Sequence, residues 1–158
     1  MPVNEQNYNN YGLVCGLQYE RYFRKELVYE KDVVLPLFRK YPDSQIAWSG
    51  PWLINLDVAS TYREQLQELS QKRPSVSWLK SENDINILAV HLSQQLNVRL
   101  EDERIALFRF YDPRVIHRVK GILSKQQGEE ILQGISAWRY FLDGTNYTFS
   151  MNDIGIAS

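Results

Sequence analysis

The sequence predicts an α/β domain in which helices flank a mixed β-sheet. Three observations predict it. Short apolar runs of strand length are interleaved with segments whose apolar residues recur at helical spacing. Asp143-Gly144 stands between two aromatic runs, as in a β-hairpin turn. No repeat or linker divides the chain. We therefore expect one domain over residues 11–158, preceded by a flexible segment at residues 1–10.

The first half of the chain predicts three strands and two helices. The apolar runs at residues 11–17, 32–38 and 52–56 predict strands, and the second of these should end near Pro36. The charged segment at residues 19–29 predicts a short helix. Thr61 with Glu64 predicts a capping box at the start of a second helix, which ends before Pro74.

The second half predicts short strands and further helices. Residues 76–79 predict a strand, and Ser81 with Asp84 predicts the start of a helix with an apolar stripe at Ile85, Leu88, Leu92 and Leu96. Residues 97–100 and 105–111 predict a hairpin around an acidic turn. Short helices are expected after Asp112 and after Ser124, which has Gln127 three residues later. A hairpin over residues 135–149 should close the fold.

The junction between residues 105–111 and the next helix combines several signals. Alternation predicts that Phe108 and Phe110 face the core with Ala106, while Ile105, Leu107, Arg109 and Tyr111 face the other way. Asp112 is placed to cap the helix, and Pro113 suits its first position. Asp112 is also placed to accept a hydrogen bond from the side chain of Arg109 or Arg114. This chemistry favours a rigid joint over a binding site, so we expect Arg109→Ala and Asp112→Ala to act mainly through stability.

Motifs for catalysis or cofactor binding are absent. The chain has no Gly-rich phosphate loop, no Gly-x-Ser-x-Gly elbow and no His-Glu-x-x-His zinc helix. Cys15 is expected to be a small apolar residue in a buried strand, and His91 and His117 are expected to pack beside apolar stripes. The sequence therefore predicts a protein that is not an enzyme, with no cofactor and no metal.

Charge and hydropathy limit the classes of partner that the sequence predicts. A net charge of −1 disfavours nucleic acid as the main partner. No apolar run is long enough to cross a membrane, and the N-terminus lacks the pattern of a secretory signal. We expect a cytoplasmic protein without membrane insertion.

Aromatic residues are abundant, at 13% of the chain. Tyr and Trp are favoured as anchors of protein interfaces because they contribute a large area at low entropic cost. Tyr11, Trp48 and Trp138 are the candidates for partner binding, and a core rich in large rings is the alternative.

The run from Leu107 to Val115, Leu-Phe-Arg-Phe-Tyr-Asp-Pro-Arg-Val, resembles the signature of the domain of unknown function 4123 family. Weaker similarities occur in the same order along the chain, at residues 11–14, 52–56, 84–99 and 124–138. The signature residues that carry the resemblance, in a structural or a partner-binding role, are Phe108, Arg109, Phe110, Tyr111, Asp112, Pro113 and Arg114.

The resemblance implies a function. Members of that family act as chaperones or adaptors for effectors of the bacterial type VI secretion system. This implies a protein that binds one toxic effector, keeps it soluble and helps load it onto a VgrG-type spike protein. Many relatives continue into a second, helical lobe, which this chain is expected to lack. The alternatives are an immunity protein that neutralises an effector, and a small enzyme with a site around Arg109, Asp112 and Arg114.

Overall fold

The computed structural model describes residues 8–39, 43–99 and 102–154. The strands are β1 (Asn9–Cys15), β2 (Val34–Pro36), β3 (Pro51–Asn55), β4 (Val76–Ser81), β5 (Asn97–Arg99), β6 (Ile105–Leu107), β7 (Ile135–Leu142) and β8 (Thr145–Thr148). The α-helices are α1 (Gly16–Phe23), α2 (Tyr62–Lys72), α3 (Ile85–Gln94), α4 (Pro113–Val119) and α5 (Lys125–Ile131). Two 3₁₀ helices, η1 (Asp43–Ser49) and η2 (Met151–Asp153), complete the described elements.

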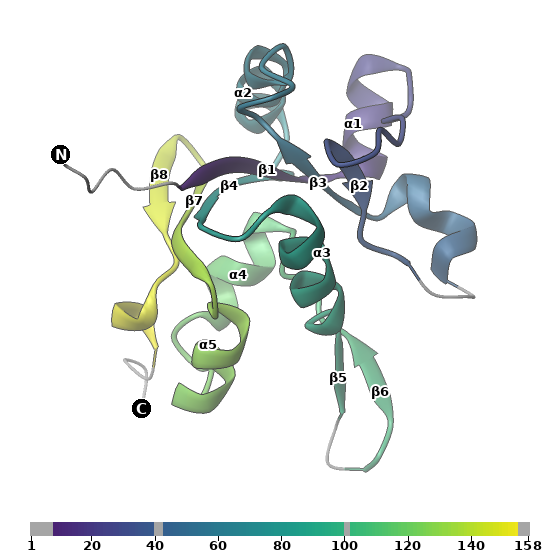
Figure 1. Cartoon of the computed structure of the whole chain (residues 1–158). Coiled ribbons are helices and arrows are strands. Elements are labelled where there is room, and N and C mark those ends of the chain that lie inside the picture. Colours follow the sequence, from purple (N-terminus) through teal and green to yellow (C-terminus); the bar gives the residue numbers. More distant parts are fainter. Residues whose placement is uncertain (1–7, 40–42, 100–101, 155–158) are drawn as a thin grey trace, which may run out of the picture.

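Six strands form one sheet in the order β2-β3-β1-β4-β7-β8, with α1 and α2 on one side of it and α3, α4 and α5 on the other (Figure 1). The predicted α/β class, with helices flanking a sheet, is confirmed. Each neighbouring pair in this sheet is antiparallel. The described strands therefore contain no parallel pair, and the antiparallel pairing expected for the hairpins extends across the whole sheet.

β1 occupies the middle of the sheet because its residues are apolar on both faces. Tyr11 and Leu13 join the core that packs against α3, whereas Val14 joins the core beneath α1 and α2. The predicted buried first strand is thus present. It begins at Asn9, two residues before the predicted start of the domain, and the backbone N–H of Asn10 donates to Asp57 at 2.8 Å. The rest of the predicted flexible segment, residues 1–7, lies outside the described residues.

Two helix starts differ from the prediction. Thr61 precedes α2, but its side chain makes no capping bond and its backbone is already helical. The reason is that the chain turns before Thr61, where the carbonyl oxygens of Ala59 and Ser60 already accept from the first N–H groups of α2. The start of α3 is capped by Asp84, whose carboxylate accepts from Ile87 N at 3.0 Å, and not by Ser81.

Two early elements are shorter than predicted. The charged helix runs over Gly16–Phe23 and not over residues 19–29, because Arg24 adopts a left-handed conformation (φ 62°) and its N–H closes the helix on Glu20 O. The strand predicted at residues 32–38 is only Val34–Pro36, although it ends at the predicted proline.

The last predicted elements are confirmed. Ser124 and Gln127 form a reciprocal capping box at the start of α5. Asp143 and Gly144 both have positive φ, 50° and 83°, as a two-residue type I′ hairpin turn requires. This turn joins β7 to β8 and places their ends beside the start of β4.

Candidate functional site

The signature run begins in a strand that is shorter than predicted. β6 ends at Leu107 and, among the residues that the structure describes, pairs only with β5, in a hairpin that extends beyond α3 (Figure 1). A turn follows, in which Asp112 N donates to Arg109 O at 3.0 Å. Because the turn interrupts the alternation, Phe110 and Tyr111 are both buried although they are neighbours. The prediction of one strand over residues 105–111, with Tyr111 facing away from the core, is wrong for this reason.

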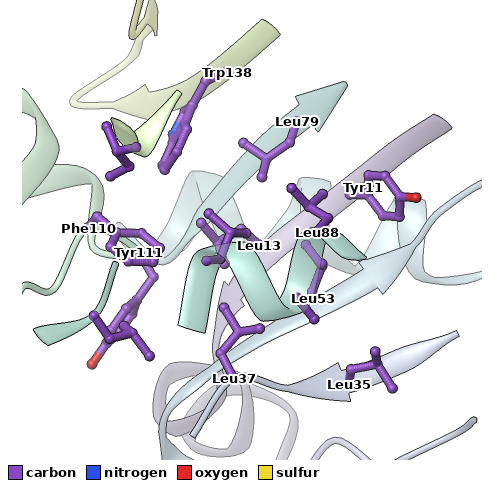
Figure 2. Packing of buried hydrophobic residues seen from close by; sticks show 14 of the residues in the cluster. Tyr11, Leu13, Leu35, Leu37, Leu53, Leu79, Leu88, Phe110, Tyr111 and Trp138 are labelled. Carbon is purple, nitrogen blue, oxygen red and sulfur yellow. The ribbon is translucent and has the colours of Figure 1, made fainter. Parts of the chain in front are cut away.

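The aromatic residues of the run fix it to the core. Phe110 is 0% exposed, and its ring lies 6.0 Å from Trp138 and 5.7 Å from Phe108, both in edge-to-face contacts. Such pairs contribute about 0.5–1.5 kcal/mol beyond the area that they bury. Figure 2 shows Phe110, Tyr111 and Leu13 in the same buried cluster. These side chains therefore position the corner and are not presented to a partner.

The polar residues of the run build the corner between the turn and α4. Asp112 caps α4 by accepting from Arg114 N at 2.9 Å, with Pro113 at the first helical position, as predicted. The Arg114 guanidinium closes onto the same carboxylate through Nε at 3.1 Å and Nη2 at 2.9 Å. This interaction raises the pKa of Arg114. Of the two predicted donors to Asp112, the structure thus brings Arg114 to it, while Arg109 is exposed.

The corner lies beside Cys15 at the end of β1. Burial raises the pKa of the Cys15 thiol, on which the charges of Asp112 and Arg109 also act. Burial likewise raises the pKa of Tyr111 to about 12. Both shifts move these groups further from their ionised, nucleophilic forms, which disfavours nucleophilic chemistry at this position.

Two of the three candidate partner-binding aromatics lie in the core. Tyr11 is 0% exposed, with its hydroxyl donating to Asn83 O at 2.7 Å, and Trp138 is 1% exposed. Their sheet positions face α3, so neither offers its ring to a partner in this conformation. Trp48, in η1, is half-buried, and its carbonyl oxygen accepts from Trp52 Nε1 at 3.2 Å.

Each histidine is tied to a neighbouring element. His91 Nε2 lies 3.0 Å from Ile131 O, which links α3 to α5. His117 Nδ1 lies 2.9 Å from the hydroxyl of Tyr140, whose pKa is raised by burial, and its ring lies 4.4 Å from that of Tyr147. These contacts fasten α4 to the β7–β8 hairpin, in agreement with the packing role expected for both residues.

Two of the hollows on the described surface gather cationic side chains. The larger, of about 830 Å³, includes Trp78, Lys80 and Arg139. The Arg139 guanidinium lies 4.3 Å from the Trp78 ring centroid and donates to Asn146 Oδ1, and its burial lowers the pKa of Arg139. The smaller, of about 350 Å³, includes Arg114 and lies between α2, α4 and the β7–β8 turn.

The pairing of Trp78 with Arg139, and the meeting of Lys72 and Arg73 with Arg118, were missed in the sequence. Trp78 stands in a strand with ordinary alternation, and Arg139 is about 60 positions away, so only the pairing of β4 with β7 brings them together. Lys72 and Arg73 precede Pro74 and were interpreted only as the end of a helix. No local pattern links them to Arg118 on α4.

A known protein family matches most of the elements described above. The family model described as Domain of unknown function (DUF4123) matches residues 11–130, which is more than half of the 158 residues. The chain belongs to the DUF4123 family. The DUF4123 match begins in β1 and ends in α5, so it includes the corner from Phe108 to Arg114. Searches of curated proteins and of solved structures gave no match. Among the described residues of this DUF4123 protein, no helix has the length and apolar character needed to cross a bilayer.

The corner yields a first testable prediction. Asp112→Ala should lower the free energy of unfolding by about 1–2 kcal/mol, because it removes the cap of α4 and the partner of Arg114. Asp112→Asn should keep most of the cap and lose only the ion pair. Urea unfolding of both variants measures the difference. Arg109→Ala is the matched control. Contrary to the loss of stability expected from the sequence, it should stay within about 0.5 kcal/mol of the wild type, because the side chain is exposed. An Asp112→Ala variant as stable as the wild type would contradict the role of Asp112 in stabilising the corner.

Proposed function

We propose that this DUF4123 protein is a chaperone or adaptor for a type VI secretion effector. It binds one toxic effector in the cytoplasm, keeps it soluble and helps load it onto a VgrG-type spike protein. The observation that carries the proposal is the family match over residues 11–130, since the family is associated with adaptors of this kind. The sequence resemblance from Leu107 to Val115 falls inside the matched range.

The geometry of the corner argues against a catalytic site there. The sequence left open a small enzyme with a site around Arg109, Asp112 and Arg114. In the structure the carboxylate of Asp112 is engaged by the N–H and the guanidinium of Arg114, while Arg109 is exposed on the surface. A carboxylate held in this way is poorly placed to act as a general base. This favours a structural role for the corner.

The surface offers the features that a partner needs. Two hollows lie outside the core, and one of them has a Trp ring stacked under an Arg, a pair of residue types that is enriched in binding hot spots. Exposed apolar side chains also occur on α3, at Ile87 and Val90. An effector chaperone uses such surfaces to hold cargo without modifying it.

Co-expression with the neighbouring effector and spike genes tests the proposal. The expected result is a complex that survives affinity purification and gel filtration, together with an effector that becomes insoluble when this chain is omitted. If the three proteins purify separately and the effector is equally soluble alone, the proposal is wrong. Rescue of cells from effector toxicity by this chain, with effector export intact in a deletion strain, would indicate an immunity protein instead.

A further inference from the structure

The smaller hollow is strongly basic. We name it the basic hollow and define it by the Lys and Arg side chains that line it: Lys72 and Arg73 at the end of α2, and Arg114 and Arg118 on α4. His117 also lines it. α2 and α4 lie on opposite sides of the sheet, so the hollow sits at the rim of the sheet, beside the β7–β8 turn. Residues up to 46 positions apart in the sequence thus contribute to one surface.

The positive charge of the basic hollow is not neutralised by the fold. Four Lys and Arg side chains line it, and the single carboxylate among the lining residues is Asp143, so the formal charge is +3 with His117 neutral. Counting Asp112, the partner of Arg114, still leaves +2. Lys72 and Arg118 form no ion pair with any residue that the structure describes. The whole chain carries −1, so this concentration of charge is local.

Helix ends explain part of this arrangement. Lys72 is the last residue of α2 and Arg118 lies in the last turn of α4, where the helix dipole favours a cation by about 0.3–1 kcal/mol. Arg114, however, lies in the first turn of α4, where the dipole disfavours a cation. The dipoles also give no reason for the two helix ends to meet at one hollow. An anionic partner would relieve the repulsion between these cations.

The wall of the hollow is apolar. Pro74, Phe141 and Leu142 line it together with the cations, and all three are half-buried. A hollow of about 350 Å³ is near the lower end of ligand-site volumes, which suits one or two side chains of a peptide. Cations around an apolar wall match an acidic segment that carries an apolar side chain.

We propose that the basic hollow binds an acidic segment of the protein cargo. This inference rests on the proposed function, to which it adds the chemistry of the partner and the surface that receives it. Protein is favoured over nucleic acid because apolar side chains line the same small hollow as the cations, and because the chain as a whole carries a net charge of −1.

A short fluorescent peptide of Asp and Glu with one central Leu is the direct probe. Its anisotropy should report binding that weakens with salt, and the double variant Lys72→Glu/Arg118→Glu should lose about tenfold or more in affinity. Lys25→Glu/Lys31→Glu is the matched control: both residues are exposed, lie between α1 and β2, and change the net charge equally. Equal losses in the two double variants would overturn the proposal. So would stronger binding of duplex DNA or inorganic phosphate that depends on the same residues.

The cargo complex separates this inference from the proposed function. Each double variant is purified with the effector from the neighbouring gene, after its melting temperature has been shown to match the wild type. Loss of the complex only in Lys72→Glu/Arg118→Glu supports the basic hollow as the receiving surface. A complex unaffected by that variant refutes the basic hollow alone. Failure of the wild-type chain to bind effector, with peptide binding intact, refutes the proposed function and leaves an acid-binding surface for another protein.

Discussion

Replacing Phe110 with alanine should lower the free energy of unfolding by about 3–5 kcal/mol, the usual cost of truncating a buried Phe. The side chain is 0% exposed and lies in edge-to-face contact with Phe108, Tyr111 and Trp138. Its loss would leave a cavity beneath the corner and remove all three ring contacts. Since domains of this kind are stable by about 5–15 kcal/mol, the variant should be close to unfolding at growth temperature.

Urea or thermal unfolding followed by circular dichroism measures this effect. Phe110→Leu should recover part of the loss because it refills most of the volume without the ring geometry. Ile122→Ala is the surface control, since Ile122 is 70% exposed and its truncation should change stability by about 0.5 kcal/mol or less. A Phe110→Ala protein that melts within a degree of the wild type would refute the account of the signature run as a core anchor.

Gly16→Ala should be comparably damaging for a different reason. Gly16 joins β1 to α1, and its N–H donates to Gly50 O at 2.7 Å. A Cβ at this position would lie 2.0 Å from Trp48 O and 2.9 Å from Gly50 O. Both are backbone atoms, so η1 or the start of α1 would have to move. We expect a loss of about 3 kcal/mol or more, at the upper end of the cost of overpacking.

The control for Gly16→Ala is Gly128→Ala in α5. There the added Cβ meets only side-chain atoms, of Ile154 and Met151, which can shift, while alanine improves the helix propensity. The same unfolding measurement should show a smaller loss than for Gly16→Ala, because only the Ile154 side chain, whose Cγ1 is 2.8 Å from the added Cβ, has to shift. If Gly16→Ala is as mild as Gly128→Ala, the close approach between α1 and η1 is not needed for the fold.

Local chemistry made parts of this fold predictable. The Asp112 cap with Pro113, the Ser124 capping box and the Asp143-Gly144 turn each depend on residues within a few positions of one another, and all three are present. The end of β6 could not be predicted, because the turn at residues 109–112 buries two neighbouring aromatics against a core formed by distant strands.

The candidate binding surfaces were harder to predict from the sequence than the fold. Thr61 resembles a helix cap in the sequence. In the structure, however, carbonyl groups of the preceding turn accept from the first N–H groups of α2, so a side-chain cap is not needed. The basic hollow depends on the sheet order, which brings the end of α2 and the start of β4 next to α4 and the β7–β8 turn. A charge cluster that forms only when distant elements come together produces no recognisable pattern in the local sequence. Tyr11 and Trp138 show the converse, since residue types that suit an interface proved to be core.

The strand order also determines when each strand can pair while the chain is being synthesised on the ribosome. By the time Ser81 has emerged, β2, β3, β1 and β4 can already form a contiguous four-stranded part of the sheet. The outer edge of β4 then waits for β7, which is complete at Leu142, roughly 60 residues later. At about 5–20 residues per second, that edge stays open for about 3–12 s of translation. During this interval the nascent chain can pair with a neighbouring nascent copy, and slow codons between the two strands would lengthen the exposure.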